Sequence, residues 1–244
     1  MQELNYNEFK NQFIYHFNKY NISFDETILN EFYCFTKYLL AENEKYNLTS
    51  ITKTEEIIVK HYIDSIIPLV VYDIPKNAKI IDIGSGAGFP ALPMSIMRKD
   101  LNITFLDSSA KKINFIKNTP NENKFIYCCE RAEILGHDIN FRETYDFAFS
   151  RAVAEFNILC ELAAPLLKTN GRFIAYKSQK AEDEIKRAEN AIETLGIKIE
   201  EKTEYNLKIN GQNDIKRTLI KTIKTKRTPK TYPRKFSEIS KNPL

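Results

Sequence analysis

The sequence lacks an apolar run that could cross a bilayer. Its longest candidate, residues 63–72, is interrupted by Asp64, Ser65 and Pro68, so it falls well short of the ~20 apolar residues that a spanning helix needs. The first residues also lack a basic segment followed by an apolar one, and we therefore expect no signal peptide. These absences predict a protein without a membrane partner.

Cysteine is scarce as well, with four residues in 244. Cys128 and Cys129 are adjacent and cannot form an ordinary disulfide with each other, and no pair has the Cys-x-x-Cys spacing of a zinc site. We therefore expect a reduced, cytoplasmic protein with no metal centre. Hydrophobic residues (43%) and charged residues (28%) are close to the averages of globular proteins, which excludes a disordered or fibrous chain.

Acidic residues are nearly absent from the end of the chain. The last 29 residues contain ten lysines and arginines but one acid, Glu238, whereas the rest of the chain has 26 basic residues against 31 acidic ones. Such a block is typical of a segment that binds a polyanion. Because Pro229, Pro233 and Pro243 interrupt it, we expect residues 224–244 to form an extended tail that packs poorly by itself. The candidate contacts to the phosphates of such a polyanion are Lys224, Lys226, Arg227, Lys230, Arg234 and Lys235.

The rest of the chain divides into a helical part and an alternating part. Apolar residues at helical spacing fill residues 1–71, and we expect the last helix there to end at Pro68. Repeated strand–helix units in 72–223 predict a mostly parallel, seven-stranded sheet with helices on both faces and a closing antiparallel strand. The expected strands span 78–83, 103–106, 125–128, 145–149, 172–176, 198–207 and 215–223, and the helices among them span 91–98, 109–118, 155–167 and 181–195.

Glycine is rare, yet three of the seven glycines fall within five positions. Gly84, Gly86 and Gly88 follow the first expected strand, and glycine lets the backbone approach a ligand without a Cβ in between. The Gly-x-Gly-x-x-Gly loop of a dinucleotide-binding fold would have its last glycine at position 89, where this chain has Phe89. The lysine of a P-loop is absent as well. The motif Asp82-Ile-Gly-Ser-Gly-Ala-Gly instead resembles motif I of the S-adenosylmethionine-dependent methyltransferases, which have a Rossmann-like α/β fold.

Acidic residues after the next two strands extend this candidate site. Asp107 ends the second strand, where its carboxylate could accept both hydroxyls of a ribose, or could cap the helix that follows. Ala132 and Glu133 follow the third strand, where such folds hold adenine, although Glu133 could also simply begin a surface helix.

Motifs along most of the chain point to one family. The segments in order are Asn47-Leu48-Thr49, Lys60-His61-Tyr62-Ile63-Asp64-Ser65, Asp82 to Pro90, Leu106-Asp107-Ser108, Arg131-Ala132-Glu133, Ser150-Arg151-Ala152, Tyr176-Lys177 and Tyr232-Pro233-Arg234-Lys235. Together they resemble the bacterial ribosomal RNA small subunit methyltransferase G family (RsmG, also called glucose-inhibited division protein B). The resemblance implies methylation of guanine N7 in small-subunit ribosomal RNA, either naked or in the assembled small subunit, by a cytoplasmic enzyme that we expect to be a monomer.

The resemblance also implies which residues hold the methyl donor. Three departures from the family pattern put local contacts in doubt, because Ala91, Glu130 and Ser178 stand where glycine is common. The expected S-adenosylmethionine contacts are Asp82, Gly84, Ser85, Gly86, Gly88, Phe89, Asp107, Ser108, Ala132, Glu133 and Arg151.

Guanine N7 carries a lone pair and no proton, so its methylation needs no general base. We therefore expect an enzyme that works by positioning the reactants. Arg151 and Lys177, at strand ends, and His61 and Asn47, before the sheet, are the candidates for orienting the guanine or its phosphate. For Arg151 the alternative is a surface ion pair, and for His61 it is a structural role.

Other functions stay open on the sequence alone. The fold could serve a methyltransferase for another RNA or for a small molecule, although the basic tail argues against the latter. It could also belong to a non-catalytic RNA-binding protein. A nicotinamide-dependent oxidoreductase is disfavoured by Phe89.

Overall fold

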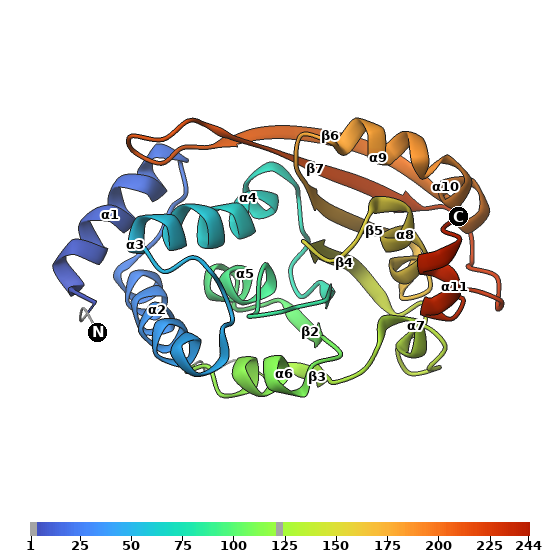
Figure 1. Cartoon of the computed structure of the whole chain (residues 1–244), viewed down its shortest axis with the longest axis horizontal. Coiled ribbons are helices and arrows are strands. Elements are labelled where there is room, and N and C mark those ends of the chain that lie inside the picture. The colour runs from blue at the N-terminus through green and yellow to red at the C-terminus, as the bar shows by residue number, and fades with distance from the viewer. Residues whose placement is uncertain (1–3, 121–123) are drawn as a thin grey trace.

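The computed structural model describes residues 4–120 and 124–244, and within them one sheet of seven strands runs through the molecule (Figure 1). The strand order is β3-β2-β1-β4-β5-β7-β6, in which β1 to β5 are parallel and β7 is antiparallel to both of its neighbours. The predicted fold class is therefore confirmed. The strands are β1 (Lys79–Ile83), β2 (Asn102–Leu106), β3 (Ile126–Cys128), β4 (Tyr145–Arg151), β5 (Leu167–Lys177), β6 (Ile197–Leu207) and β7 (Ile215–Lys224).

Helices lie on both faces of this sheet. None of those in the described ranges is long and apolar enough to span a membrane. The helices are α1 (Tyr6–Lys19), α2 (Glu26–Tyr46), α3 (Thr54–Glu56), the π-helical segment η1 (Ile57–Ile63), α4 (Asp64–Val71), α5 (Ala91–Met97), α6 (Ala110–Lys117), α7 (Ala132–Leu135), α8 (Phe156–Ala163), α9 (Ala181–Arg187), α10 (Glu189–Leu195) and α11 (Phe236–Lys241).

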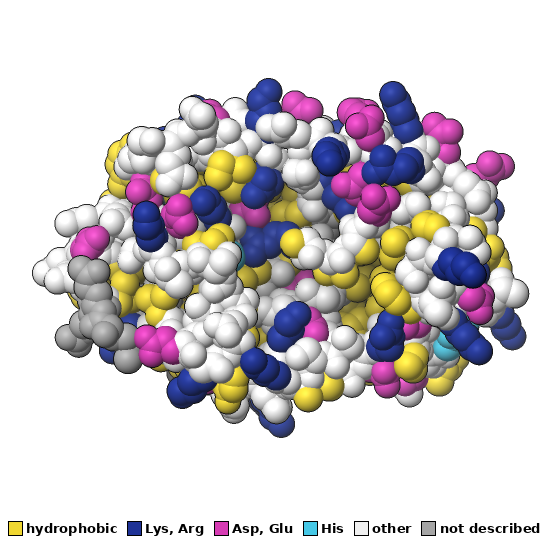
Figure 2. Space-filling model, viewed as in Figure 1, with side chains coloured by type: hydrophobic (Ala, Val, Ile, Leu, Met, Phe, Trp, Pro, Cys, Tyr) yellow, Lys and Arg dark blue, Asp and Glu magenta, His cyan; other side chains and the backbone are white. Residues whose placement is uncertain are grey.

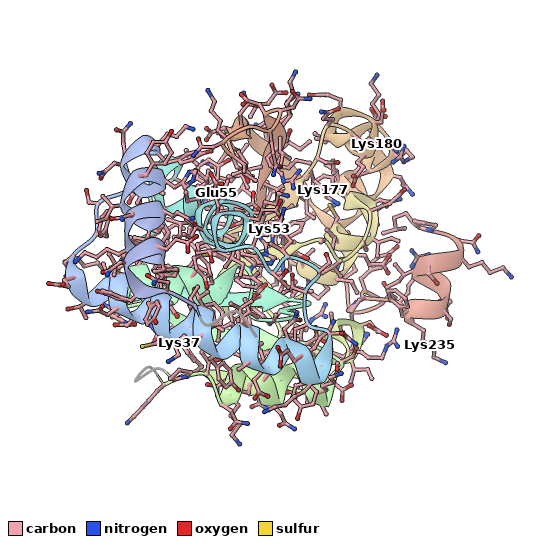
Figure 3. The ribbon with its side chains drawn as sticks, turned by 60° about the vertical axis from the view of Figure 1, so that its left-hand side comes forward. Lys37, Lys53, Glu55, Lys177, Lys180 and Lys235 are labelled. Atoms are coloured by element: carbon pink, nitrogen blue, oxygen red, sulfur yellow. The ribbon has the colours of Figure 1, made fainter. Side chains whose placement is uncertain are left out.

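Alternation along the strands produces two hydrophobic cores. Side chains of neighbouring strand residues point to opposite faces, so Ile80 lies in one core and Ile81 in the other. The first core joins α1, α2, η1, α4, α5 and α6 to one face of the sheet, and the second joins α8, α9 and α10 to the opposite face. In Figure 3, α1 stands upright at the left, and α2 runs across the lower front of the molecule. The N-terminal helices thus cover part of the sheet and share its core.

The expected helix end at Pro68 is wrong. The helical course from α3 continues through η1 and α4 to Val71, three residues beyond the proline. A proline inside a helix removes one backbone hydrogen bond and typically costs ~3 kcal/mol. Ile66 and Ile67, which are almost fully buried beside it, supply apolar burial that offsets this cost.

The C-terminal segment is also better packed than its prolines predicted. Thr228, Pro233 and Ile239 are buried, and the segment ends in α11 beside α7 and α8 (Figure 1). Glu161, a fully buried acid of α8, pairs with Arg234 through a 2.6 Å contact between Oε2 and Nη2. Arg142 donates hydrogen bonds to backbone carbonyls of the segment. We expected an extended segment that packs poorly by itself. The segment is not extended throughout, since it includes the short helix α11, and buried partners in the α/β domain hold it in place.

The position of Lys224 also differs from the prediction. Its side chain is fully buried at the end of β7, where Nζ donates to the backbone oxygens of Ala164 and Leu167 and pairs with Glu143 Oε1 at 2.6 Å. The prediction that Lys224 contacts RNA phosphate is therefore wrong. The pattern of basic residues did not reveal that the first of them still belongs to the last strand.

Replacing Lys224 with alanine should destabilise the protein. The substitution removes a buried ammonium, leaves the carbonyls of Ala164 and Leu167 without this donor and takes the ion-pair partner from Glu143, which typically costs about 3 kcal/mol. Urea unfolding followed by circular dichroism measures the change. The exposed Lys230→Ala serves as the control, and equal free energies of unfolding for the two variants would contradict the buried role of Lys224.

Candidate functional site

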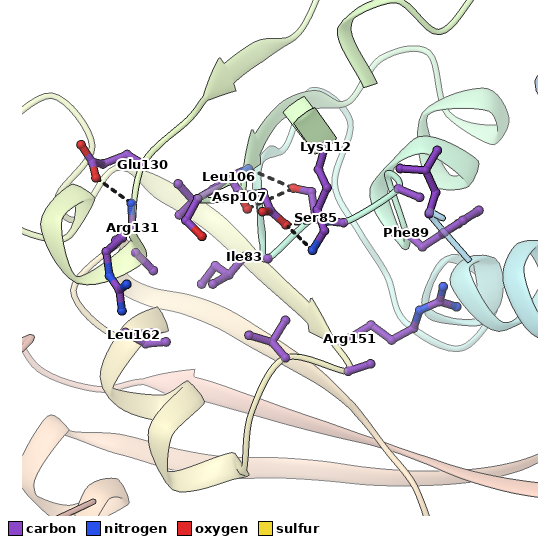
Figure 4. Close-up of a pocket in the computed structure, with 18 of the residues that line it drawn as sticks. Ile83, Ser85, Phe89, Leu106, Asp107, Lys112, Glu130, Arg131, Arg151 and Leu162 are labelled. Atoms are coloured by element: carbon purple, nitrogen blue, oxygen red, sulfur yellow. Dashed lines mark hydrogen bonds and ion pairs between the residues drawn. The ribbon is translucent and has the colours of Figure 1, made fainter. Parts of the chain in front are cut away.

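A cleft of about 590 Å³ lies at the carboxyl ends of β1, β2 and β4. Ligands of open α/β sheets bind at this edge. Figure 2 shows a hollow near the middle of this face, with Lys and Arg side chains in it and around its rim. The walls come from the loop after β1, the ends of β2 and β4, the segment after β3, the turn between α2 and α3, η1, α8 and α11. Figure 4 shows Ser85, Asp107, Arg131 and Arg151 around this cleft.

The glycine loop is fixed to the neighbouring strand by backbone hydrogen bonds. Gly84 N and Ser85 N both donate to Leu106 O, at 2.8 and 3.0 Å, and Leu106 N donates to Ser85 Oγ at 2.9 Å. Gly84 has a φ of +72°, and a Cβ at this position would collide with the Val153 side chain. Glycine is therefore required here both by backbone conformation and by the close approach of the loop after β4.

Asp107 stands beside this loop at the end of β2. Its Oδ2 accepts from Gly86 N at 3.0 Å, and its Oδ1 accepts from Ser109 N at 2.9 Å. Lys112 Nζ lies 3.6 Å from Oδ2 and also faces the cleft. The carboxylate thus orders the start of α6 and at the same time faces the cleft, so the two roles considered for Asp107 are compatible.

The far end of the cleft lies beyond β3. Glu130 turns back on its own segment, where Oε1 accepts from Arg131 N at 2.8 Å, and Arg131 Nε pairs with Glu133 Oε1 at 2.5 Å. Ala132 also lines this end, as does Phe236 of α11. The glutamate at the position where the family has glycine therefore does not close the cleft.

A cluster of stacked side chains forms the opposite end. The His61 ring lies parallel to Phe89 with 4.3 Å between centroids, and the Arg151 guanidinium lies 5.1 Å from the Phe89 centroid. Arg151 Nη2 approaches His61 Nδ1 at 3.3 Å, and His61 Nε2 is 2.9 Å from Thr49 Oγ1. The cluster joins the end of β4 to the N-terminal helices α1 to α4 and η1, which together form a helical cover over one face of the sheet.

Asp64 holds Arg151 in this cluster. Its Oδ2 lies 2.9 Å from Arg151 Nη1, while its Oδ1 accepts from the Tyr205 hydroxyl at 2.7 Å. Arg217 Nε is 3.8 Å from the same Oδ1. Asp64 is almost fully buried, so this ion pair is shielded from solvent and fixes the guanidinium.

A second cavity of about 460 Å³ adjoins the cleft and shares His61, Arg151 and Ala152 with it. Lys177 lines this second cavity, not the cleft. Its ammonium donates to Ala154 O at 2.7 Å and pairs with Glu184 Oε2 at 2.7 Å. Two connected cavities thus meet at Arg151.

Most residues predicted for the donor site lie together around the cleft, but two do not. Asp82 is fully buried beneath the loop, where Oδ2 accepts from Ala91 N at 3.4 Å, and Gly88 (φ +89°) shapes the turn against Leu92. Asn47, a candidate for orienting guanine, instead ends α2 in a left-handed conformation and lines neither cavity. The predicted residues that line the cleft are Gly84, Ser85, Gly86, Phe89, Asp107, Ser108, Ala132, Glu133, Arg151 and His61.

Several cleft residues were not among the predicted donor contacts, although Leu48, Thr49, Ile83 and Leu106 stand within the quoted motifs. Leu48, Thr49, Ile83, Leu106, Lys112, Val153, Leu162 and Phe236 also line the cleft. Val153 could have been suspected, because it follows the Ser150-Arg151-Ala152 motif directly. Phe236 lies far along the chain from the strand ends, and no spacing rule connects it to them.

Burial changes the ionisation of two side chains near the loop. Burial, reinforced by the positive charges of Arg151 and Lys60, lowers the pKa of His61 to about 3, so the imidazole is neutral near pH 7. Burial also raises the pKa of Asp82 to about 7, and in the described part of the chain its Oδ1 has no hydrogen-bond partner. Residues 4–120 and 124–244 contain no group of three His, Cys, Asp or Glu side chains that could hold a metal ion.

Solved structures share this fold. M. jannaschii TYW2, solved in complex with AdoMet, superposes with a TM-score of 0.51 over 72% of this chain and 79% of its own, at 14% identity. A putative methyltransferase, solved in complex with the Haloferax volcanii Trm112 activator, superposes with a TM-score of 0.55 over 72% of this chain and 94% of its own, at 12% identity. At these identities the likeness concerns the fold, and the fold is that of S-adenosylmethionine-dependent methyltransferases.

Sequence comparison then identifies the family. Residues 28–213 match the family model GidB, rRNA small subunit methyltransferase G, and the chain belongs to this family. The ribosomal RNA small subunit methyltransferase G of Clostridium beijerinckii is 43% identical over 88% of this chain and 90% of its own. The protein of the same name from Oceanobacillus iheyensis is 37% identical over 96% of this chain and 98% of its own. The resemblance inferred from the motifs is confirmed.

Replacing Gly84 with alanine should weaken binding of S-adenosylhomocysteine by at least tenfold, because a Cβ there displaces Val153 and distorts the cleft wall. Isothermal titration calorimetry measures the affinity. Gly211→Ala is a matched control, since Gly211 has the same φ of +72° with open space around it. It should lose ~1 kcal/mol of stability and keep its affinity. Equal affinities of the two variants would contradict the proposed close contact.

The low pKa of His61 should make stability depend on pH. Between about pH 6.5 and pH 3 the unfolded chain binds a proton at His61 that the folded protein does not bind, so this residue lowers stability as the pH falls. Relative to His61→Gln, the wild-type protein should lose up to ~1.4 kcal/mol per pH unit in that range. Denaturant unfolding at pH 7, 6 and 5 measures both slopes, and parallel slopes would refute the prediction.

Proposed function

We propose that this protein transfers the methyl group of S-adenosylmethionine to N7 of a guanine in small-subunit ribosomal RNA. Membership of the rRNA small subunit methyltransferase G family is the observation that carries the proposal. The arrangement of two cavities that meet at Arg151 supports it, because one can receive a donor and the other an acceptor.

The cleft residues fit the donor in size and chemistry. The glycine loop presents bare backbone where a Cβ would block the approach, and the Asp107 carboxylate faces the position of a ribose. Gly84, Gly86, Asp107, Ala132 and Glu133 would hold S-adenosylmethionine, which, when bound, supplies an electrophilic methyl group. The cleft has room for such a ligand, since sites for small molecules typically measure ~300–1,000 Å³.

The chain's own residues would act by positioning. His61 is neutral and buried, so it adds no positive charge beside the cavity that receives the guanine. Arg151 is fixed by Asp64 and by the Phe89 ring, and we propose that it orients the guanine or its phosphate from the junction of the cavities. No proton has to leave N7, so this arrangement needs no general base.

The second cavity would seat the target nucleotide. Lys60, Arg217 and Lys177 contribute positive charge to its walls, against Asp64 and Glu184. Lys53 and Lys180 are exposed on the same side of the molecule (Figure 3). Of the tail residues, Lys226, Arg227, Lys230 and Lys235 are exposed and stay candidates for phosphate contacts, whereas Arg234 is engaged by Glu161.

The three ranges inferred from the sequence then have separate tasks. Residues 72–223 would hold most of the donor, residues 1–71 would complete the acceptor side through His61 and Lys60, and the exposed lysines and arginines of residues 224–244 would bind RNA. One chain supplies the walls of both cavities, which supports action as a monomer. We place the enzyme in the cytoplasm, with its ribosomal substrate, acting on naked RNA or on the assembled small subunit.

Methyl transfer to unmodified ribosomal RNA tests this function. The protein is incubated with labelled S-adenosylmethionine and with small-subunit RNA, naked or assembled, that lacks the modification, and N7-methylguanine is then mapped. We expect a single modified guanine and a rate about 100-fold lower for Arg151→Ala, because the acceptor is then misplaced. Arg187→Ala, at an exposed arginine away from both cavities, should keep the full rate.

Two results would contradict the proposal. One is the absence of methyl incorporation into either form of the small-subunit RNA. The other is equal methyl incorporation into large-subunit RNA, which would show that the enzyme is not specific for the small-subunit RNA.

A further inference from the structure

The C-terminal helix reaches back to the cleft. Figure 1 shows α11 beside α7 and α8. Phe236, the first residue of α11, is half-buried and lines the far end of the cleft together with Arg131, Ala132, Glu133 and Leu162. An aromatic ring at this position is not needed for the core, because Ile239 is the fully buried residue of α11.

The Phe236 ring is held in a defined orientation. The Arg131 guanidinium lies over it, 4.8 Å from the ring centroid, and Arg131 is itself paired with Glu133. This stack of guanidinium and ring forms a flat surface at the end of the cleft.

The segment before α11 is anchored by buried or paired groups. Arg142 donates from Nη1 to Tyr232 O at 2.9 Å and from Nη2 to Thr228 O at 2.9 Å. Glu161, fully buried, accepts from both the backbone N and the guanidinium of Arg234, two residues before the ring. A ring held in this way loses little conformational freedom when a ligand binds, which favours affinity.

We propose that Phe236 is a ligand-binding residue that contacts the purine base of the donor's adenosine, with Arg131 behind it. The inference rests on the proposed function. Asp107, at the end of β2, is the acid that would bind the ribose, so the base attached to that ribose lies one strand further, at the end of β3. Phe236 is the aromatic ring at that position, and purines stack on aromatic rings.

Calorimetric titration of the full-length protein tests the contact. Phe236→Ala should weaken binding of S-adenosylhomocysteine about tenfold, whereas Phe236→Tyr, which keeps the ring, should bind within twofold of wild type. Ser237→Ala, at the exposed neighbouring position, is the control. Thermal unfolding of each variant checks that the fold is intact.

A second ligand locates the effect. 5′-Methylthioadenosine carries the adenosine but not the amino-acid part, so Phe236→Ala should weaken its binding by the same factor. If Phe236→Ala binds both ligands normally, or loses affinity only for S-adenosylhomocysteine, the proposed contact of Phe236 with the base is overturned, while the proposed function stands. Absence of binding by the wild-type protein would instead refute the proposed function, and this inference with it.

Discussion

The buried pair between Asp64 and Arg151 joins the helical cover to the sheet, and both cavities depend on it. Arg151 ends β4, and Asp64 begins α4, so the pair fixes how the cover sits on the carboxyl edge of the strands. The second oxygen of Asp64 is engaged by Tyr205 of β6, which leaves the carboxylate little freedom to turn. Because Arg151 is shared by the two cavities, its orientation sets the boundary between the donor side and the acceptor side.

The cluster around this pair combines charge and aromatic stacking in a small volume. His61 and Arg151 approach each other closely although both can carry positive charge, and the geometry is stable because the buried imidazole stays neutral. Phe89 offers its ring to both. The residue that disfavoured a dinucleotide-binding loop in the sequence thus packs at the centre of the junction.

The sequence predicted most of the fold because its strands are short apolar runs bounded by glycine or charge. The strand around Ile80 and Ile81 and the loop after it could be located to within a residue or two. Pro68 misled, because local propensity was outweighed by burial. Lys224 misled for a related reason, since a lysine in a basic run gave no sign that three acceptors surround it in the interior.

Within the site, the sequence could locate residues that follow strands directly but not those brought in by long-range packing. Gly84 and Asp107 lie at strand ends, where topology alone brings them together. We predicted that Asp82 contacts the donor because it belongs to the same motif as the glycines. Side chains alternate between the two faces of a strand, however, and that of Asp82 lies buried beneath the loop. Phe236 could not be located, because its position follows from anchors such as Arg142 and Glu161, whose pairing is decided only in the folded molecule.

The placement of α11 has a consequence for how the protein matures. A nascent chain emerges with its N-terminal part first. The strands of the described part of the chain precede residue 225, so the sheet is complete in sequence before residues 225–244 are added, but one wall of the cleft is then missing. The cleft is therefore completed later than the sheet, when α11 packs beside α7 and α8 and brings Phe236 to its wall.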